Sequence, residues 1–390
     1  MIYNQATFDL RRAIERLMDI VKIDTANRHD ARRFLDFPFQ LYRHIPQWVP
    51  PFESDARRML DRQKHPFYRH SEAAFFLAQQ AGRVVGRLAV LDNRRYNEFN
   101  HTRTALFYLF EAENDFDISR GLFNAAFEWA RARSLTEISG PKGFTALDGL
   151  GLLVKGFEHR PALGIAYNPP YYGAMLEDVG FSHDGDVVSG YLDAHNLHFP
   201  PKIHAIAALV QKKRGLRIAR FTSRRELLSL VEPLKRMYND TLGGTEGNVP
   251  LTDDEVQTIA DQLTRYADPR LIKIVMKDEE LVGFLFAYPD VSAAVQRTKG
   301  RLLPFGWIDL LLEFKRTKWV NINGAGIVEK YRGGGGTALL FSEMEKSVVE
   351  GGFDHADLVQ IGSDNDRMQR EVGSLGIDFY KTHRLYRKQL

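Results

Sequence analysis

Four consecutive glycines form the part of this chain best suited to chemistry: Gly333, Gly334, Gly335 and Gly336. A strand pattern over residues 319–328 precedes them, and a helix pattern over residues 337–350 follows. Glycine lets the backbone approach a ligand, and the N–H groups of the first helical turn then point at that ligand. Because these groups favour negative charge, the pattern predicts a site for a phosphorylated cofactor or substrate.

Three kinds of phosphate-binding loop place glycines before a helix. A Walker loop needs a lysine after its last glycine, and Thr337 stands there instead. A dinucleotide fingerprint, G-x-G-x-x-A, fits from Gly333 to Ala338 and leaves a nucleotide-dependent oxidoreductase as one alternative. That fingerprint belongs at the start of a doubly wound sheet, and only 52 residues follow Ala338, which disfavours the oxidoreductase.

The third kind of loop fits better. The segment from Arg332 to Thr337 resembles Arg/Gln-x-x-Gly-x-Gly/Ala, the acyl-CoA pyrophosphate loop of the GNAT acyltransferase superfamily, with Thr337 in the last small position. The patterns that follow also resemble the end of a GNAT domain. They are a strand over 355–361, a turn before Asn365, a helix over 367–375 and a last strand over 379–387.

This resemblance implies acetyl-CoA, or another acyl-CoA, as the co-substrate. The loop of GNAT proteins holds the pyrophosphate, which assigns that role to Arg332, the four glycines and Thr337. The resemblance also implies that a backbone N–H at Ile327 or Val328 polarises the thioester carbonyl, and that Asn365 contacts the pantetheine arm.

GNAT enzymes transfer an acyl group from CoA to an amine by direct attack, usually with a carboxylate base and a tyrosine that protonates the thiolate. The strand here offers Asn321 and Asn323, which share one face because they alternate with apolar residues. Asparagine can orient a water or the amine, and Tyr380 is the candidate tyrosine. Asp309 and Glu313 are an alternative base, although an ion-paired or exposed pair on one helical face is the favoured interpretation.

A plan of strand, helix and hairpin recurs along the chain at a steady offset. Gly86 and Gly283 differ by 197 positions. We therefore predict an α/β (α+β) protein of two tandem GNAT-like domains, each a mixed central sheet flanked by helices. The domains are expected at residues 1–195 and 215–390, with a linker and connecting helix over 196–214.

The first copy differs from the second in two respects. Its turn over residues 111–117 carries acids where the second copy carries glycines, so it is expected to be degenerate and to lack CoA. It also contains a long glycine-rich stretch over 140–156, and long structured loops are often functional. An acceptor pocket, or alternatively a packed aromatic plug, is predicted from Tyr167, Asn168, Tyr171 and Tyr172, with Lys142 and Asp148 as polar candidates.

Composition limits the other classes of function. The chain has 390 residues, a formal net charge of +3 and no cysteine, which excludes disulfides, thiolate catalysis and cysteine zinc sites. The histidines show no metal spacing and no nucleic-acid-binding motif occurs, so neither partner is expected. The most apolar stretch, residues 302–314, is too short to span a bilayer, and no signal-peptide pattern occurs. We therefore expect no membrane partner and a cytoplasmic location.

The sequence thus predicts an acyl-CoA-dependent N-acyltransferase that transfers acetyl to a primary amine of a small molecule or peptide. A non-catalytic acyl-CoA-binding or regulatory module is the alternative, because the expected base and tyrosine are missing from their usual positions. Both would bind CoA, and only the enzyme would release free thiol when an amine is present.

Overall fold

The computed structural model of the chain divides into two compact units. It describes residues 18–390 except 146–147, 195–198, 220, 222, 224, 227–230, 243–248, 264, 266, 364–368, 371–372 and 374. The N-terminal unit comprises the described part of residues 1–160 together with Ala166–Gly185 and Arg384–Leu390. The C-terminal unit comprises Pro161–Ile165 and the described part of Asp186–His383.

The N-terminal unit is built on a mixed sheet. Its strands are β1 (Met18–Lys22), β2 (Glu72–Gln80), β3 (Arg83–Asp92), β4 (Thr104–Ala112), β5 (Glu137–Gly140) and β6 (Leu152–Lys155). Strands β1 to β5 lie in sequence order and pair antiparallel, except for the parallel pair β4 and β5. The β2–β3 hairpin turns at Ala81 and Gly82, which both have positive φ as a two-residue hairpin requires.

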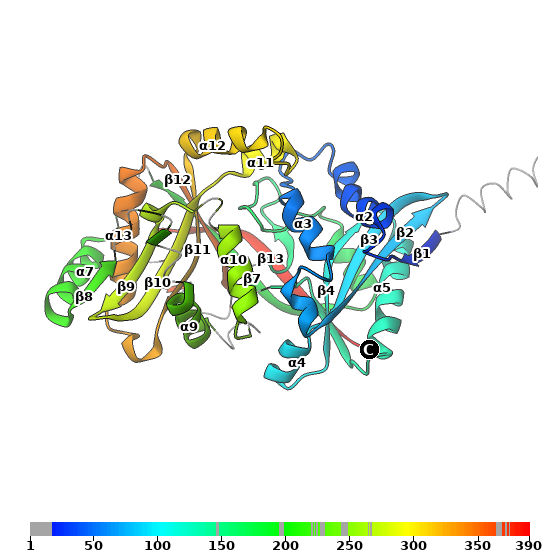
Figure 1. Cartoon of the computed structure of the whole chain (residues 1–390), viewed down its shortest axis with the longest axis horizontal. Helices are drawn as coiled ribbons and strands as arrows, with labels where there is room; N and C mark the ends of the chain where they lie inside the picture. Colours follow the sequence, from blue (N-terminus) through cyan, green and yellow to red (C-terminus); the bar gives the residue numbers. More distant parts are fainter. Residues whose placement is uncertain are drawn as a thin grey trace, which may run out of the picture. The chain divides into compact units, whose positions relative to one another are not determined.

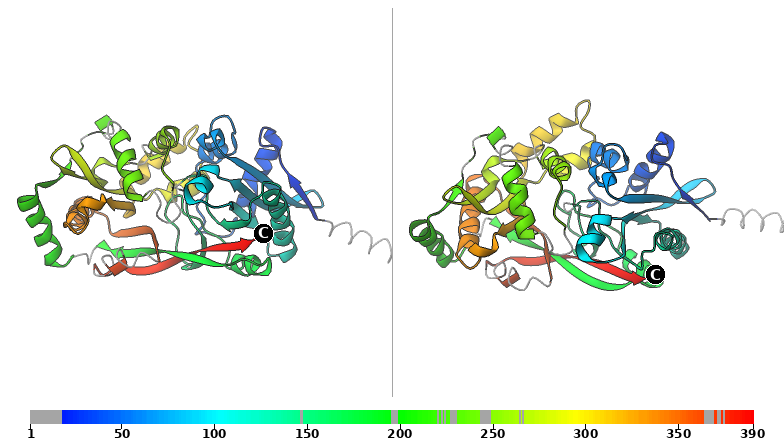
Figure 2. Two further views of the ribbon diagram at one scale, coloured as in Figure 1. Left: turned by 90° about the horizontal axis from the view of Figure 1, so that it is seen from below. Right: turned by 60° about the horizontal axis from the view of Figure 1, so that its bottom comes forward.

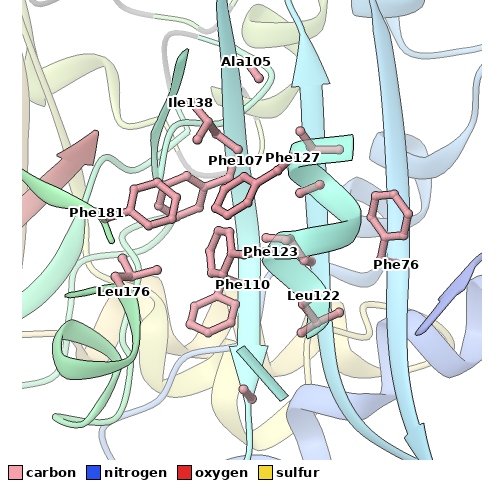
Figure 3. Close-up of a cluster of buried hydrophobic side chains, with 14 of the residues drawn as sticks. Phe76, Ala105, Phe107, Phe110, Leu122, Phe123, Phe127, Ile138, Leu176 and Phe181 are labelled. Carbon is pink, nitrogen blue, oxygen red and sulfur yellow. The ribbon is translucent and has the colours of Figure 1, made fainter. Parts of the chain in front are cut away.

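Helices cover both faces of this sheet. They are α2 (Arg28–Leu41), α3 (Glu53–Leu60), the 3₁₀ turn η1 (Pro66–Arg69), α4 (Arg94–Asn100), α5 (Phe116–Arg131) and α6 (Tyr172–Asp178). Alternating residues of each strand feed two separate cores. On the α5 face, Phe107, Phe110, Phe123 and Phe181 pack edge to face or tilted (Figure 3). On the other face, the second core is formed around Phe34 and Phe75.

The C-terminal unit repeats this design. Its strands are β8 (Leu216–Ala219), β9 (Ile272–Lys277), β10 (Glu280–Pro289), β11 (Trp319–Ile327) and β12 (His355–Gly362). Its helices are α7 (Pro201–Arg214), α9 (Val231–Leu242), α10 (Asp253–Leu263), α11 (Ser292–Thr298), α12 (Gly306–Arg316) and α13 (Gly336–Glu350), with 3₁₀ turns η3 (Pro269–Leu271) and η4 (Glu329–Tyr331). The predicted class, mixed sheets flanked by helices, is confirmed.

The faces of this second sheet have different covers. Helices α7 and α13 pack side by side over one large apolar core. Figures 1 and 2 show the two helices from different directions. Helix α9 covers the opposite face, where Met237 packs on Ile274 and Phe284. Among the described strands β8 to β12, β11 and β12 pair parallel and the other neighbours pair antiparallel.

Each sheet is completed by a strand from the other half of the sequence. Strand β7 (Ser182–Asp193) follows the N-terminal elements, yet Val187 to Asp193 pair antiparallel with β12. Strand β13 (Asp378–Gln389) closes the chain, and its Tyr386 to Gln389 pair antiparallel with β5. Each sheet thus needs strands from both halves of the sequence. The predicted domain boundaries at 195 and 215 stay a prediction.

Candidate active site

The glycine turn between β11 and α13 presents the N-terminus of a helix. Gly333 and Gly335 have φ of +73° and +86°, values that L side chains rarely adopt. Gly335 is the N-cap of α13 and no side chain caps it. Since the first-turn N–H groups of a helix have no partner within the helix, this turn can offer them to an anion.

The glycines of the turn differ in how much space surrounds them. A Cβ at Gly334 would lie 2.8 Å from the Tyr331 carbonyl oxygen, and one at Gly335 would lie 2.6 Å from Val210 Cγ1 on α7. Nothing lies within 4 Å of a Cβ at Gly333. Gly334 and Gly335 are therefore needed for close packing, whereas Gly333 borders open space.

The side chain of Arg214 lies beside this turn, although Arg214 falls within the predicted linker over residues 196–214. Helix α7 ends in Lys212, Lys213 and Arg214. The Arg214 guanidinium approaches the loop so closely that its Nη1 would be 3.0 Å from a Cβ at Gly334. Arg332 is also exposed, and its Nε donates a hydrogen bond to the Ile327 carbonyl at 3.1 Å. In the sequence, the run of three basic residues before Gly215 could have indicated that Arg214 is a candidate for binding an anion.

The strand that leads into the turn separates from its parallel neighbour. Strands β11 and β12 pair only from Trp319 with His355 to Ile322 with Leu358, although both continue further. Beyond that point β11 carries a bulge, with Gly324 at φ +87°. An extended ligand arm can hydrogen-bond to strand edges that are separated in this way.

The predicted thioester-binding positions lie after this bulge. The Val328 N–H donates to the Val282 carbonyl at 2.9 Å, so it is used within the sheet. Ile327 stands opposite Gly283 in the ladder, and its side chain packs under Gly336. Asn323 lies at the bulge and is partly exposed. Asn365 falls outside the described residues.

A buried polar cluster lies where β11 and β12 begin to separate. Asn321 and Asp357 are direct neighbours in the parallel register, and both are almost completely buried. Lys381 Nζ donates to Asp357 Oδ2 at 2.6 Å, and Asn321 Nδ2 lies 3.4 Å from Asp290 Oδ1. The Tyr380 hydroxyl hydrogen-bonds to Asp357, so the predicted catalytic residues Asn321 and Tyr380 belong to one cluster. No sequence pattern had indicated its two carboxylates.

The environment of the cluster controls its protonation. Burial raises the pKa of Asp357, and the Lys381 ammonium partly opposes that rise. Burial, followed by the nearby Asp357 carboxylate, raises the pKa of the Tyr380 hydroxyl well above its usual range. Tyr380 therefore stays protonated at neutral pH and can donate a proton or a hydrogen bond.

The alternative base on α12 is ion-paired. Arg297 Nη2 lies 2.7 Å from Asp309 Oδ1 and 2.5 Å from Glu313 Oε2. The guanidinium also lowers the pKa of Asp309 by direct hydrogen bonding. The favoured interpretation of this pair as a structural ion pair agrees with these contacts. Within the described residues, no group of three His, Asp or Glu is placed to hold a metal ion.

The N-terminal unit has the same strand bulge but no glycine turn after it. Its β4 bulges where Leu109 has φ +52°, so that Phe107 and Phe110 face the same core, as Ile322 and Ala325 do in β11. The Asp115 carboxylate then caps α5 by accepting from the Asp117 N–H at 3.0 Å. A carboxylate therefore caps the helix of this copy, and its expected lack of CoA stays a prediction.

The aromatic cluster of the N-terminal unit supports its backbone. Asn168 bonds to both the N–H and the carbonyl of Leu153, at 2.7 and 3.2 Å. The Tyr171 hydroxyl donates to the Ala112 carbonyl at 2.9 Å, and the Tyr172 hydroxyl accepts from the Ala112 N–H at 2.7 Å. Tyr167 donates to the Phe157 carbonyl at 2.9 Å. These contacts match the packed plug, and acceptor contact stays a prediction.

Tyr172 also contributes to a buried network around Glu111. The Glu111 carboxylate accepts from Tyr42 and, at 3.2 Å, from the Tyr172 hydroxyl. Arg87 Nη2 lies 3.6 Å from Glu111 Oε1, and Arg87 Nη1 donates to the Phe34 carbonyl at 2.9 Å. Burial raises the pKa of Glu111 despite these donors. The network ties β3, β4, α2 and α6 together.

The polar candidates in the glycine-rich stretch are Lys142 and Asp148. Lys142 Nζ lies 4.8 Å from the centre of the Tyr96 ring. The Thr145 N–H donates to Asp148 Oδ2 at 2.8 Å, yet burial raises the pKa of Asp148 to about 6. Because the folded pKa is raised, the protonated form stabilises the fold below the unfolded value of about 4, and this contribution disappears as pH rises through 6.

We therefore expect Asp148→Asn to flatten the pH dependence of stability. We expect the free energy of unfolding of the wild type, measured with urea, to decrease relative to that of the variant as pH rises from 4.5 to 7.5. The decrease should be at most about 3 kcal/mol. Asp178→Asn is the matched control, because Arg120 lowers the pKa of Asp178, so its contribution is already complete at pH 4.5 and this variant should keep the wild-type slope. Equal slopes for the wild type and Asp148→Asn would contradict the assigned shift.

Comparisons with known proteins place these features in context. The chain is 29% identical over 384 residues to a protein named bacterial ceramide synthase from Caulobacter vibrioides, covering 95% of this chain and 98% of that protein. It is 27% identical over 370 residues to the Escherichia coli protein YghO, covering 93% and 94%. No family model matches the sequence.

The likeness to solved structures concerns the fold. A tandem GNAT protein from the clavulanic acid biosynthesis pathway superposes with a TM-score of 0.55 and 14% identity, covering 96% of this chain and 98% of that one. No helix among the described residues is long and apolar enough to cross a membrane. With its two mixed sheets, each with a parallel pair and a bulged strand before a helix, this chain has the tandem two-domain fold of the GNAT superfamily.

Proposed function

We propose that this chain is an acyl-CoA-dependent N-acyltransferase whose C-terminal unit binds the CoA. The observation that carries the proposal is the uncapped N-terminus of α13 behind Gly333 and Gly335. In an acyltransferase fold, this turn offers backbone N–H groups to a pyrophosphate, and Arg214 adds a positive charge beside it. The N-terminal unit, whose equivalent helix is capped by Asp115, would not bind CoA.

The reaction is a direct transfer with balanced proton movements. The amine nitrogen attacks the thioester carbonyl carbon, the C–N bond forms and the C–S bond breaks. The nitrogen releases one proton to solvent water, the thiolate takes one from its donor, and that donor then recovers a proton from solvent. Tyr380, which stays protonated, is the proposed donor to the thiolate, and Asp357 on β12 positions it by hydrogen bonding. Asn321 would orient the amine or a water at the same point.

The acceptor is proposed to be a long-chain amino alcohol, with a fatty acyl-CoA as donor. A ceramide is an amide of a fatty acid with such an amine, and a protein of that name aligns with nearly the whole of this chain. This proposal extends the expected acetyl transfer to longer acyl chains. The test is thiol release with palmitoyl-CoA or acetyl-CoA, each with sphinganine or a short primary amine.

The four combinations separate the possibilities. Thiol release that needs both palmitoyl-CoA and sphinganine would support the lipid acceptor. Release with acetyl-CoA and the short amine would support the narrower small-molecule acetyltransferase. Binding of acyl-CoA without thiol release from any pair would leave the non-catalytic module, the alternative that the sequence had left open.

Arg214→Gln is expected to weaken acyl-CoA binding by about tenfold, because a charge-assisted hydrogen bond to a phosphate is lost. The measurement is isothermal titration with palmitoyl-CoA at two salt concentrations, and the difference should shrink at high salt. Arg217→Gln is a control, since Arg217 lies on neighbouring β8 and donates instead to the Asp278 carbonyl. Unchanged affinity for Arg214→Gln would remove this residue from the site.

A further inference from the structure

Helices α11 and α12 form a hairpin over residues 292–316 (Figure 1). Several of its large apolar side chains are exposed. Leu303 and Phe305 in its connection are 82% and 73% exposed, and Leu311 on α12 is 52% exposed. The other large apolar side chains exposed on α12 are Trp307, Ile308 and Leu312. A contiguous apolar surface of this kind marks an interaction site.

Helix α12 is amphipathic in the reverse sense. A surface helix normally turns its charged side to water and its apolar side to the core. Here Asp309 and Glu313 point toward α11, where Arg297 binds both carboxylates. Trp307 and Leu311, one turn apart, are exposed instead. Arg297 therefore holds the helix with its apolar face outward.

The border of this apolar face is basic. Since Arg297 binds both acids of α12, the exposed charges around the face are cationic. The exposed basic residues on and beside the hairpin are Lys299, Arg301, Lys315 and Arg316. Basic residues next to tryptophan and leucine are typical of helices that lie in the interface of an anionic bilayer.

We propose that the α11–α12 hairpin docks the protein on the surface of an anionic lipid bilayer, with Phe305, Trp307 and Leu311 inserted at the headgroup boundary. Helix α12 is too short to span a bilayer, so the docking is interfacial. The expectation of no membrane partner rested on the lack of a segment long enough to span a bilayer. Docking on the bilayer surface does not require such a segment. The inference is independent of the proposed acyl transfer.

Vesicle flotation with the full chain tests the proposal. The wild type should float with vesicles of phosphatidylcholine and phosphatidylglycerol at 7:3, and more weakly with phosphatidylcholine alone. The double variant Leu311→Glu/Leu312→Glu should lose at least about tenfold in binding, because two leucine side chains no longer leave water. Both side chains are exposed, so the fold should tolerate the changes.

Two further variants isolate the cause. Val349→Glu is the matched control, because Val349 is 58% exposed on α13, away from the hairpin, and its replacement should leave flotation unchanged. Lys315→Gln/Arg316→Gln should remove most of the preference for phosphatidylglycerol, with little effect on binding to phosphatidylcholine. Circular dichroism and a thermal melt check that each variant is folded.

Several results would overturn the proposal. Wild-type protein that fails to float with the anionic vesicles would do so, as would a Leu311→Glu/Leu312→Glu variant that floats as well as the wild type. Light scattering addresses a second copy of the chain as the occupant. A wild-type dimer that does not bind vesicles and that this variant converts to monomers would make the apolar face a dimer interface.

Discussion

Gly333→Asp is expected to weaken acyl-CoA binding at least about tenfold, whereas Gly333→Asn should have a small effect. Both side chains tolerate the positive φ of this position, and nothing lies within 4 Å of the added Cβ. The two variants differ in charge alone. A carboxylate within several ångströms of a pyrophosphate costs on the order of 1–3 kcal/mol at the effective dielectric constant of a protein surface.

Isothermal titration with palmitoyl-CoA provides the comparison. Gly335→Glu is a poorer test, because its Cβ would collide with Val210 and disturb the packing of α7 on α13. Loss of binding in Gly333→Asp with near-normal binding in Gly333→Asn assigns the pyrophosphate to this turn. Equal affinities for the two variants would place the phosphate elsewhere, whatever the catalytic activity.

Tyr380→Phe is expected to lower kcat by about a hundredfold and to leave the affinity for acyl-CoA nearly unchanged. Loss of a positioned proton donor typically costs a factor of this size. Phenylalanine keeps the ring, whose centre lies 5.8 Å from that of Tyr191, so the packing should survive. Steady-state thiol release gives kcat, and titration of the variant gives the affinity.

Tyr191→Phe is the matched control for this prediction. Tyr191 belongs to the same aromatic group, and its hydroxyl lies 2.9 Å from His355 Nδ1, whereas the Tyr380 hydroxyl bonds to Asp357. Its loss should change kcat by less than about threefold if Tyr380 is the donor. An unchanged kcat in Tyr380→Phe would assign the thiolate proton to another group.

The glycine turn could be predicted from the sequence because its cause is local. A run of glycines at a strand-to-helix junction permits positive φ and leaves the helix without a side-chain cap, and Gly333 and Gly335 have such angles. The tandem fold could also be predicted, since the periodic patterns of both halves agree. Asn321 and Asn323 could be assigned to one strand because they alternate with apolar residues along the sequence.

The rest of the candidate site depends on contacts between distant segments. Asp357 and Lys381 meet because β12 and β13 are brought together in the fold, and no spacing in the sequence indicates that pair. Arg214 reaches the turn because α7 packs on α13. The exchange of β7 and β13 between the sheets leaves no local signal either, because a strand pattern does not name its partner.

The exposed face of α12 shows the same limit. Its sequence predicts an amphipathic helix with Asp309 and Glu313 on one side. It does not indicate that Arg297 binds both acids on the inner side and leaves Trp307 and Leu311 exposed. Periodicity determines which residues share a face, and tertiary contacts determine which face meets water.

The most direct test of the central claim is mass spectrometry of the products when the full chain is incubated with palmitoyl-CoA and sphinganine. The account predicts the N-palmitoyl amide and free CoA in equal amounts, with both reduced together in Gly333→Asp and nearly retained in Gly333→Asn. CoA release without amide, or amide formed equally by the wild type and Gly333→Asp, would contradict an N-acyltransferase that works through this glycine turn.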